Sequence, residues 1–208
     1  MTFGNNLTMT RLTAFGFSLF TLCVAVMPAL ADEVQGTPTW TVTELMRDLA
    51  QVKKSKATFV EHKYLSMLKK PLSFSGTLEY TAPGRLEKRT LLPKPESMVL
   101  DQDRLEVQSG GAGQKRVLSL QDYPAIWAFV ESIRSTLAGD LETLNRFYLV
   151  TLEGNSQEWL LILQPLDSKM KGMVSEIRIN GGADQINTIE IRESGGDYSV
   201  MNISRDDL

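Results

Sequence analysis

Most of the chain after residue 56 consists of short segments in which apolar and polar side chains alternate, with turn-forming residues between them. In the clearest segment, Phe74, Gly76, Leu78 and Tyr80 alternate with polar or acidic residues. Such a period of two is typical of a β-strand that has one face on an apolar interior and the other in water. With a strand from Ala57, further strands are expected at 86–91, 98–100, 105–108, 114–120, 147–154, 157–165, 173–180, 186–193 and 197–204.

Short turns connect these segments, and this fixes how the strands pair. Pro83-Gly84, Gly154-Asn155, Gly181-Gly182 and Gly195-Gly196 are turn-forming pairs. Strands joined in this way pair antiparallel, because parallel pairing needs long crossover connections. One sheet of about eleven strands must curl strongly or approach closure into a barrel. We therefore predict a mainly β (α+β) fold built on a curled antiparallel sheet.

A short amphipathic helix is expected before the first strand. Thr41 and Glu44 have the spacing of a capping box, and Val42, Leu45 and Leu49 follow at helical intervals. The plain role of this helix is to cover an apolar surface.

A second helical stretch interrupts the strands. Asp122 can cap it, Pro124 suits its first turn, Gly139 ends it, and Asp140 begins a shorter helix that runs through Phe147. Its apolar stripe is Ile126, Trp127, Phe129, Val130, Ile133 and Leu137, and its polar side is Glu131, Ser132, Arg134 and Ser135. Such helices either cover a hollow sheet as a lid or complete a solid core, and periodicity is equally compatible with both.

Residues 1–31 are predicted to be a secretory signal peptide. Arg11 precedes an apolar run of about 15 residues, and a small-x-small cleavage pattern ends at Ala31. The run is shorter than the ~20 residues that a membrane-spanning helix needs, although an uncleaved anchor is the alternative. Cys23, the one cysteine, follows the bulky Leu22, so lipid attachment there is not expected. Residues 32–208 are then a single exported domain.

The sequence offers no catalytic, metal or cofactor site. His62 is the only histidine, and residues 32–208 contain no cysteine, which excludes a Cys/His metal centre in that part. No nucleophile-elbow motif accompanies His62, and the segment 110–115 lacks the spacing of a phosphate-binding loop. The chain carries 22 basic and 25 acidic residues without a basic block, so nucleic acid is not an expected partner. We predict a protein that is not an enzyme.

The order of elements resembles the LolA family of outer-membrane lipoprotein carriers. The resemblance rests on the first helix, the strand that begins Ala57-Thr58-Phe59, the strand at 72–81 with its Pro-containing turn, and Leu163-Gln164-Pro165 before three hairpin-linked strands. It covers essentially all of 32–208. It implies an unclosed barrel with a helical lid, which as a periplasmic monomer binds the acyl chains of lipoproteins or a related lipid. An inner-membrane donor and an outer-membrane acceptor are the implied protein partners.

One position departs from the family pattern. The family has an arginine directly before the proline of the early turn, and that arginine holds the lid by hydrogen bonds. Here Ala82 precedes Pro83, and Arg85 is out of register. The departure suggests a LolA-related paralogue.

A hollow interior would be lined by the apolar faces of the sheet and the helix. The expected cavity wall is Phe59, Phe74, Leu78, Tyr80, Leu86 and Ile177, and the expected lid is Trp127, Phe129, Val130, Ile133 and Leu137. The alternative is a periplasmic interaction or sensor domain on the same half-barrel, without a transported cargo.

Overall fold

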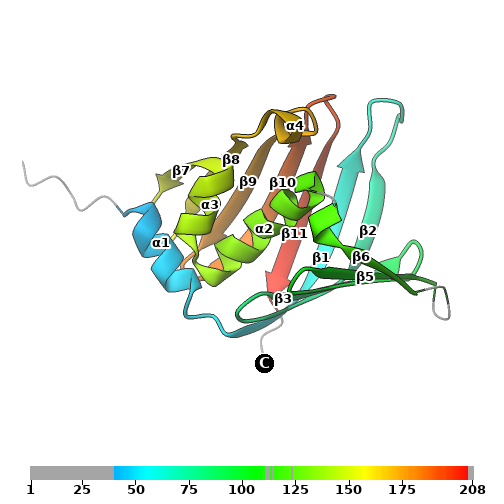
Figure 1. Cartoon of the computed structure of the whole chain (residues 1–208), viewed down its shortest axis with the longest axis horizontal. Coiled ribbons are helices and arrows are strands. Elements are labelled where there is room, and N and C mark those ends of the chain that lie inside the picture. Colours follow the sequence, from blue (N-terminus) through cyan, green and yellow to red (C-terminus); the bar gives the residue numbers. More distant parts are fainter. Residues whose placement is uncertain (1–39, 111–112, 114, 123, 206–208) are drawn as a thin grey trace, which may run out of the picture. The chain divides into compact units, whose positions relative to one another are not determined.

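Eleven strands form one sheet in the order β6-β5-β4-β3-β2-β1-β11-β10-β9-β8-β7, and every neighbouring pair is antiparallel (Figure 1). The computed structural model describes residues 40–110, 113, 115–122 and 124–205, all within one unit that spans Thr37–Leu208. The expected signal peptide and its cleavage site lie outside the described residues. The sheet confirms the predicted curled, unclosed antiparallel fold.

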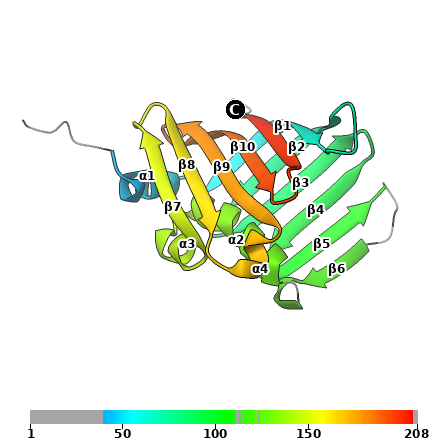
Figure 2. The same ribbon diagram turned by 90° about the horizontal axis from the view of Figure 1, so that it is seen from above.

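The strands lie close to where alternation placed them. They are β1 (Lys54–Tyr64), β2 (Leu72–Thr81), β3 (Arg85–Leu92), β4 (Glu96–Asp101), β5 (Arg104–Ser109), β6 (Lys115–Ser119), β7 (Tyr148–Gly154), β8 (Trp159–Pro165), β9 (Val174–Gly182), β10 (Gln185–Glu193) and β11 (Tyr198–Arg205). The first strand pairs with the last, and β6 and β7 are the two edges, at opposite ends of the sheet in Figure 2.

Register defines which side chains share the concave face. Phe59 on β1 lies opposite Gly76 on β2 and Ile203 on β11. Since side chains alternate along a strand, odd-numbered residues of β1 and β11 share one face with even-numbered residues of β2. Glu61 therefore lies on the same face as Phe59, two residues further along β1.

The first helix, α1 (Val42–Leu49), begins where the capping box predicts. Thr41 accepts a hydrogen bond from the Glu44 amide at 3.3 Å, and the Glu44 carboxylate accepts one from the Thr41 amide at 2.8 Å. Leu45, Met46 and Leu49 are buried, so the helix covers an apolar surface as expected.

The helices α2 (Pro124–Ala138) and α3 (Leu141–Phe147) follow a short 3-10 turn at Leu120–Asp122. Gly139 ends α2 in a left-handed conformation (φ +70°), and a Cβ there would lie 2.1 Å from the Met46 carbonyl oxygen. The Asp140 carboxylate caps α3 through the Thr143 amide at 2.9 Å.

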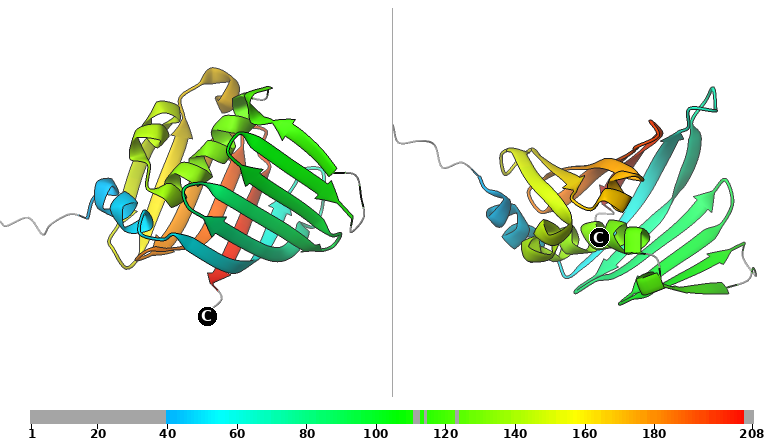
Figure 3. Two further views of the ribbon diagram at one scale, coloured as in Figure 1. Left: turned by 60° about the horizontal axis from the view of Figure 1, so that its bottom comes forward. Right: turned by 45° about the horizontal axis from the view of Figure 1, so that its top comes forward.

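The helical segment joins the two edge strands, and this places it across the concave side of the sheet (Figure 3). Glu131, Ser132 and Ser135, on the polar side of α2, are buried, and both α1 and α3 pack against this helix. Internal hydrogen bonds satisfy them; Ser132, for example, donates to the Phe129 carbonyl at 2.7 Å.

Apolar packing occurs in two clusters. The larger joins α1 and α3 to β8 and β9, and the smaller contains Leu100, Leu105 and Leu120. Trp127 contacts both clusters and meets Phe147 edge to face at 4.9 Å between ring centroids. A fourth helix, α4 (Ser168–Lys171), was not anticipated from the sequence. No helix in the described part of the chain is long and apolar enough to cross a membrane.

Candidate functional site

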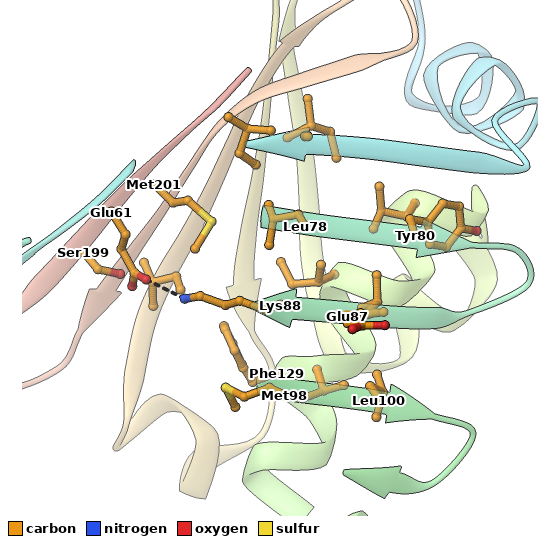
Figure 4. A pocket seen from close by; sticks show the side chains of 18 of the residues that line it. Glu61, Leu78, Tyr80, Glu87, Lys88, Met98, Leu100, Phe129, Ser199 and Met201 are labelled. Carbon is orange, nitrogen blue, oxygen red and sulfur yellow. Dashed lines mark hydrogen bonds and ion pairs between the residues drawn. The ribbon is translucent and has the colours of Figure 1, made fainter. Parts of the chain in front are cut away.

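A cavity of about 780 Å³ lies between the concave face of the sheet and α2. Its volume falls within the range of about 300–1,000 Å³ that is usual for ligand pockets. The strands β2 to β5 contribute Leu78, Tyr80, Leu86, Met98, Leu100 and Leu105 to its lining, several of which are shown in Figure 4. The opposite wall comes from β10 and β11 through Ile186, Ile191, Met201 and Ile203.

Seven of the residues expected from the sequence line this cavity. They are Leu78, Tyr80 and Leu86 from the expected wall and Phe129, Val130, Ile133 and Leu137 from the expected lid. The apolar stripe of α2 thus faces the apolar face of the sheet across an open space, so the interior is not a completely filled core.

Four expected site residues do not line the cavity. Ile177 and Trp127 belong to the packed core that the helices cover. Phe59, 2 % exposed, lies beneath the Lys88 ammonium group, 4.8 Å from the ring centroid. Phe74 lies nearer the tip of the β1–β2 hairpin, with the Lys63 ammonium group 5.5 Å from its ring centroid. Alternation assigned the strand residues to a face of the sheet, and it carries no information on what covers them.

Charged residues that the sequence reasoning missed also line the cavity. Glu61 is only 4 % exposed, and its Oε2 accepts a hydrogen bond from Lys88 Nζ at 2.6 Å (Figure 4). Lys63 Nζ lies 3.7 Å from the other oxygen, Oε1. A signal for them was present, since Glu61 is two residues from Phe59, and Lys88 two from Leu86. The same alternation that selected the apolar residues places these charges on the inner face.

Arg134 joins α2 to two turns of the sheet. Its Nη1 donates a hydrogen bond to the Gln102 carbonyl in the β4–β5 turn at 3.0 Å, and its guanidinium pairs with the buried Glu131 carboxylate. A Cβ added to Gly84, in the β2–β3 turn, would lie 2.5 Å from Arg134 Cδ, so the arginine stem packs directly on that glycine. Ala82 of this turn stands where the family pattern has an arginine, and here the turn is contacted by Arg134 of α2 instead.

Three loops meet at one end of the strands, at the top of Figure 1. The Ser66 amide in the β1–β2 loop donates to the Asp197 carboxylate in the β10–β11 turn at 2.7 Å. The Ser194 amide in that turn donates to the Met173 carbonyl, next to α4, at 3.0 Å. Leu65, Met173 and Gly195 also line the cavity, so these loops form its rim.

Burial raises the pKa of two tyrosine hydroxyls in this region. Burial raises the pKa of Tyr80, in the cavity wall, above its usual value. Burial also raises the pKa of Tyr148, beneath α2, to about 12, while a hydrogen bond with Ser132 opposes the shift.

The one histidine, His62, does not line the cavity. His62 lies on the opposite face of the sheet from Glu61, and its Nδ1 is 3.0 Å from the Ser73 hydroxyl. No carboxylate contact to His62 is found among the described residues, and no group of three potential metal ligands occurs among them.

A family model matches most of the chain. The family described as outer membrane lipoprotein carrier protein LolA-like matches residues 37–203. The chain belongs to this LolA-like family. No curated protein matches the chain in sequence.

Several solved structures are similar to this LolA-like chain at low identity. A LolA superfamily protein from Nitrosomonas europaea is 10 % identical, with a TM-score of 0.44, over 82 % of this chain and 96 % of that one. MucB from Pseudomonas aeruginosa, solved in complex with MucA, is 14 % identical, with a TM-score of 0.45, over 78 % and 55 %. A putative outer membrane lipoprotein-sorting protein domain from Vibrio parahaemolyticus is 12 % identical, with a TM-score of 0.42, over 78 % and 89 %.

Proposed function

We propose that this LolA-like protein is a non-enzymatic periplasmic carrier that binds the acyl chains of a lipoprotein or a related lipid and shuttles them toward the outer membrane. The cavity between α2 and the curled sheet carries this proposal, because its lining is mainly aliphatic and aromatic. Burying each CH2 group of a chain contributes about 0.8 kcal/mol. A single long chain is therefore enough for tight but reversible binding.

Membership of the LolA-like family supports an acylated cargo and a role in the cell envelope. The signal peptide proposed at 1–31 would deliver the protein to the periplasm. The intact mass of the protein from a periplasmic extract tests this step, because cleavage after Ala31 leaves Asp32 as the first residue. A mass that retains residues 1–31 would refute it.

The carrier function is tested by titrating the protein with a fluorescent acyl probe. Leu78→Trp would project a bulky ring into the cavity and obstruct the path of an acyl chain, and Ile133→Asp would place a carboxylate in its apolar lining. Both variants are expected to weaken probe binding at least tenfold. Circular dichroism and urea unfolding would verify that each variant is folded. Leu78→Trp introduces no charge into the interior, so it still tests the proposal if Ile133→Asp fails to fold.

Val60→Asp is the matched control, because Val60 lies on the other face of β1 and is 46 % exposed. It is expected to bind the probe as the unaltered protein does. Unchanged affinity in folded Leu78→Trp, or an equal loss in Val60→Asp, would refute binding in this cavity.

A further inference from the structure

Two lysines converge on one buried carboxylate inside the otherwise mainly apolar cavity. Lys88 comes from β3, and Glu61 and Lys63 come from β1, so two strands separated by β2 bring the three charges together. Both ammonium groups lie within 4 Å of the Glu61 carboxylate, one on each oxygen. This charged cluster, Glu61, Lys63 and Lys88, carries one more positive than negative charge. The lining also includes Glu79, Glu87, Asp184, Glu193 and Arg205, of which Glu79 and Glu87 pair with Lys56 and Arg89 and Asp184 pairs with Arg205.

Stability alone does not account for these charges. Moving an ion pair out of water costs free energy, and this cost cancels much of the gain from the attraction between the two charges. A protein with apolar residues of similar size in their place is often as stable. Leu78 and Met98 occupy neighbouring positions on the same inner face, so the site accommodates apolar residues. The cluster is therefore a candidate for recognising something that enters the cavity.

The cluster retains hydrogen-bond donors for a ligand. A lysine ammonium has three N–H donors and no acceptor. Lys88 uses one donor on Glu61, while the Phe59 ring covers part of its ammonium group. Lys63 Nζ is 3.7 Å from Glu61, beyond hydrogen-bond length, so this attraction is electrostatic and leaves its donors available to a closer acceptor.

The apolar lining continues from the cluster along the same strands. Figure 4 shows Met98 and Met201 beside the Lys88–Glu61 pair, and Tyr80 and Leu100 further along the wall. An extended chain that starts at Lys88 could lie along Leu78 and Leu100, beneath α2. This arrangement suits a molecule with a polar end and a long apolar end.

We propose that Lys63 and Lys88 bind the anionic head of a long-chain amphiphile, a carboxylate or a phosphate, whose chain fills the cavity. This proposal rests on the carrier function and specifies the chemistry of the cargo. Glu61 is a positioning residue here, because it holds the two ammonium groups on the inner face.

The test compares ligands that share one chain and differ in the head. Calorimetric titration with palmitate, 1-palmitoyl lysophosphatidic acid and neutral methyl palmitate is expected to show that at least one anion binds about tenfold or more tightly than the ester. A preference for palmitate indicates a free fatty acid as the natural source, and a preference for the phosphate indicates a phospholipid.

The decisive variant is the triple substitution Glu61→Gln, Lys63→Met and Lys88→Met, which removes all three charges and leaves no carboxylate unpaired. It is expected to bind methyl palmitate as before and to lose the preference for the anions. The matched control removes the same charges outside the cavity lining.

In that control, Glu106→Gln and Lys115→Met remove a lysine–glutamate pair between β5 and β6, 2.7 Å apart, and Lys54→Met removes an exposed cation. The control is expected to retain the anion preference. Equal affinity of the unaltered protein for all three ligands, or a preference that survives the triple substitution, would overturn the proposal. Failure of all three ligands to bind would instead refute the carrier function itself.

Discussion

Replacing Arg134 by methionine should loosen the attachment of α2 to the sheet. The contacts of Arg134 indicate how much unfolding free energy would be lost. Removing one partner of a buried ion pair costs about 3–5 kcal/mol, because the other charge is left buried. The Arg134 side chain is 22 % exposed and that of Glu131 only 9 %, so the lower part of this range applies. Loss of the hydrogen bond to the Gln102 carbonyl adds about 1 kcal/mol. We expect Arg134→Met to lower the free energy of unfolding by about 4 kcal/mol.

The matched variant combines Arg134→Met with Glu131→Gln, so that no charge is left unpaired. We expect it to recover about 2 kcal/mol of the loss, since about half of the cost comes from the stranded carboxylate. Urea unfolding followed by tryptophan fluorescence would measure both values. Stopped-flow mixing with an acyl probe should show faster uptake in Arg134→Met, because α2 is less firmly held. A loss below 0.5 kcal/mol with an unchanged uptake rate would refute the role assigned to Arg134.

Three further predictions concern the packing around the cavity. Because the pKa of Tyr148 is raised from 10 to about 12, its contribution to stability is complete below pH 10 and is lost as the pH rises through 12. Relative to Tyr148→Phe, the protein should therefore lose about 2 kcal/mol over that interval in urea unfolding, and parallel pH profiles would contradict the burial of this hydroxyl. Thr41→Ala should cost about 1 kcal/mol of unfolding free energy by removing the cap of α1, and an unchanged urea midpoint would show that the capping box contributes nothing. Gly139→Ala should lower the thermal midpoint by several degrees, because φ is +70° and the new Cβ would collide with the Met46 carbonyl; an unchanged midpoint would contradict this helix end.

Local patterns were sufficient to predict most of the elements. Alternation and turn residues located the strands, and the capping box at Thr41 and the glycine at 139 marked helix ends. These features depend on neighbours within a few residues, so one sequence contains them. The short helix α4 lacked such a pattern, being only four residues long.

The sequence predicted only part of the cavity lining, because local patterns do not specify contacts between distant residues. The alternation of side chains assigned Leu78 and Phe59 to the same face of the sheet. Only Leu78 lines the cavity, because Lys88 from β3 covers Phe59. The contact of Arg134 with Gly84 and Gln102 brings together residues far apart in the sequence. Both outcomes depend on contacts between residues that are distant in the sequence, and a period of two does not specify which distant residues meet.

Native mass spectrometry of the protein purified gently from periplasm tests the central claim most directly. We expect a population that carries non-covalent adducts with the mass of a long-chain amphiphile, and a loss of that population in folded Leu78→Trp. Bare polypeptide alone, with the same spectrum for the unaltered protein and for Leu78→Trp, would contradict the claim that the cavity beneath α2 carries acyl chains.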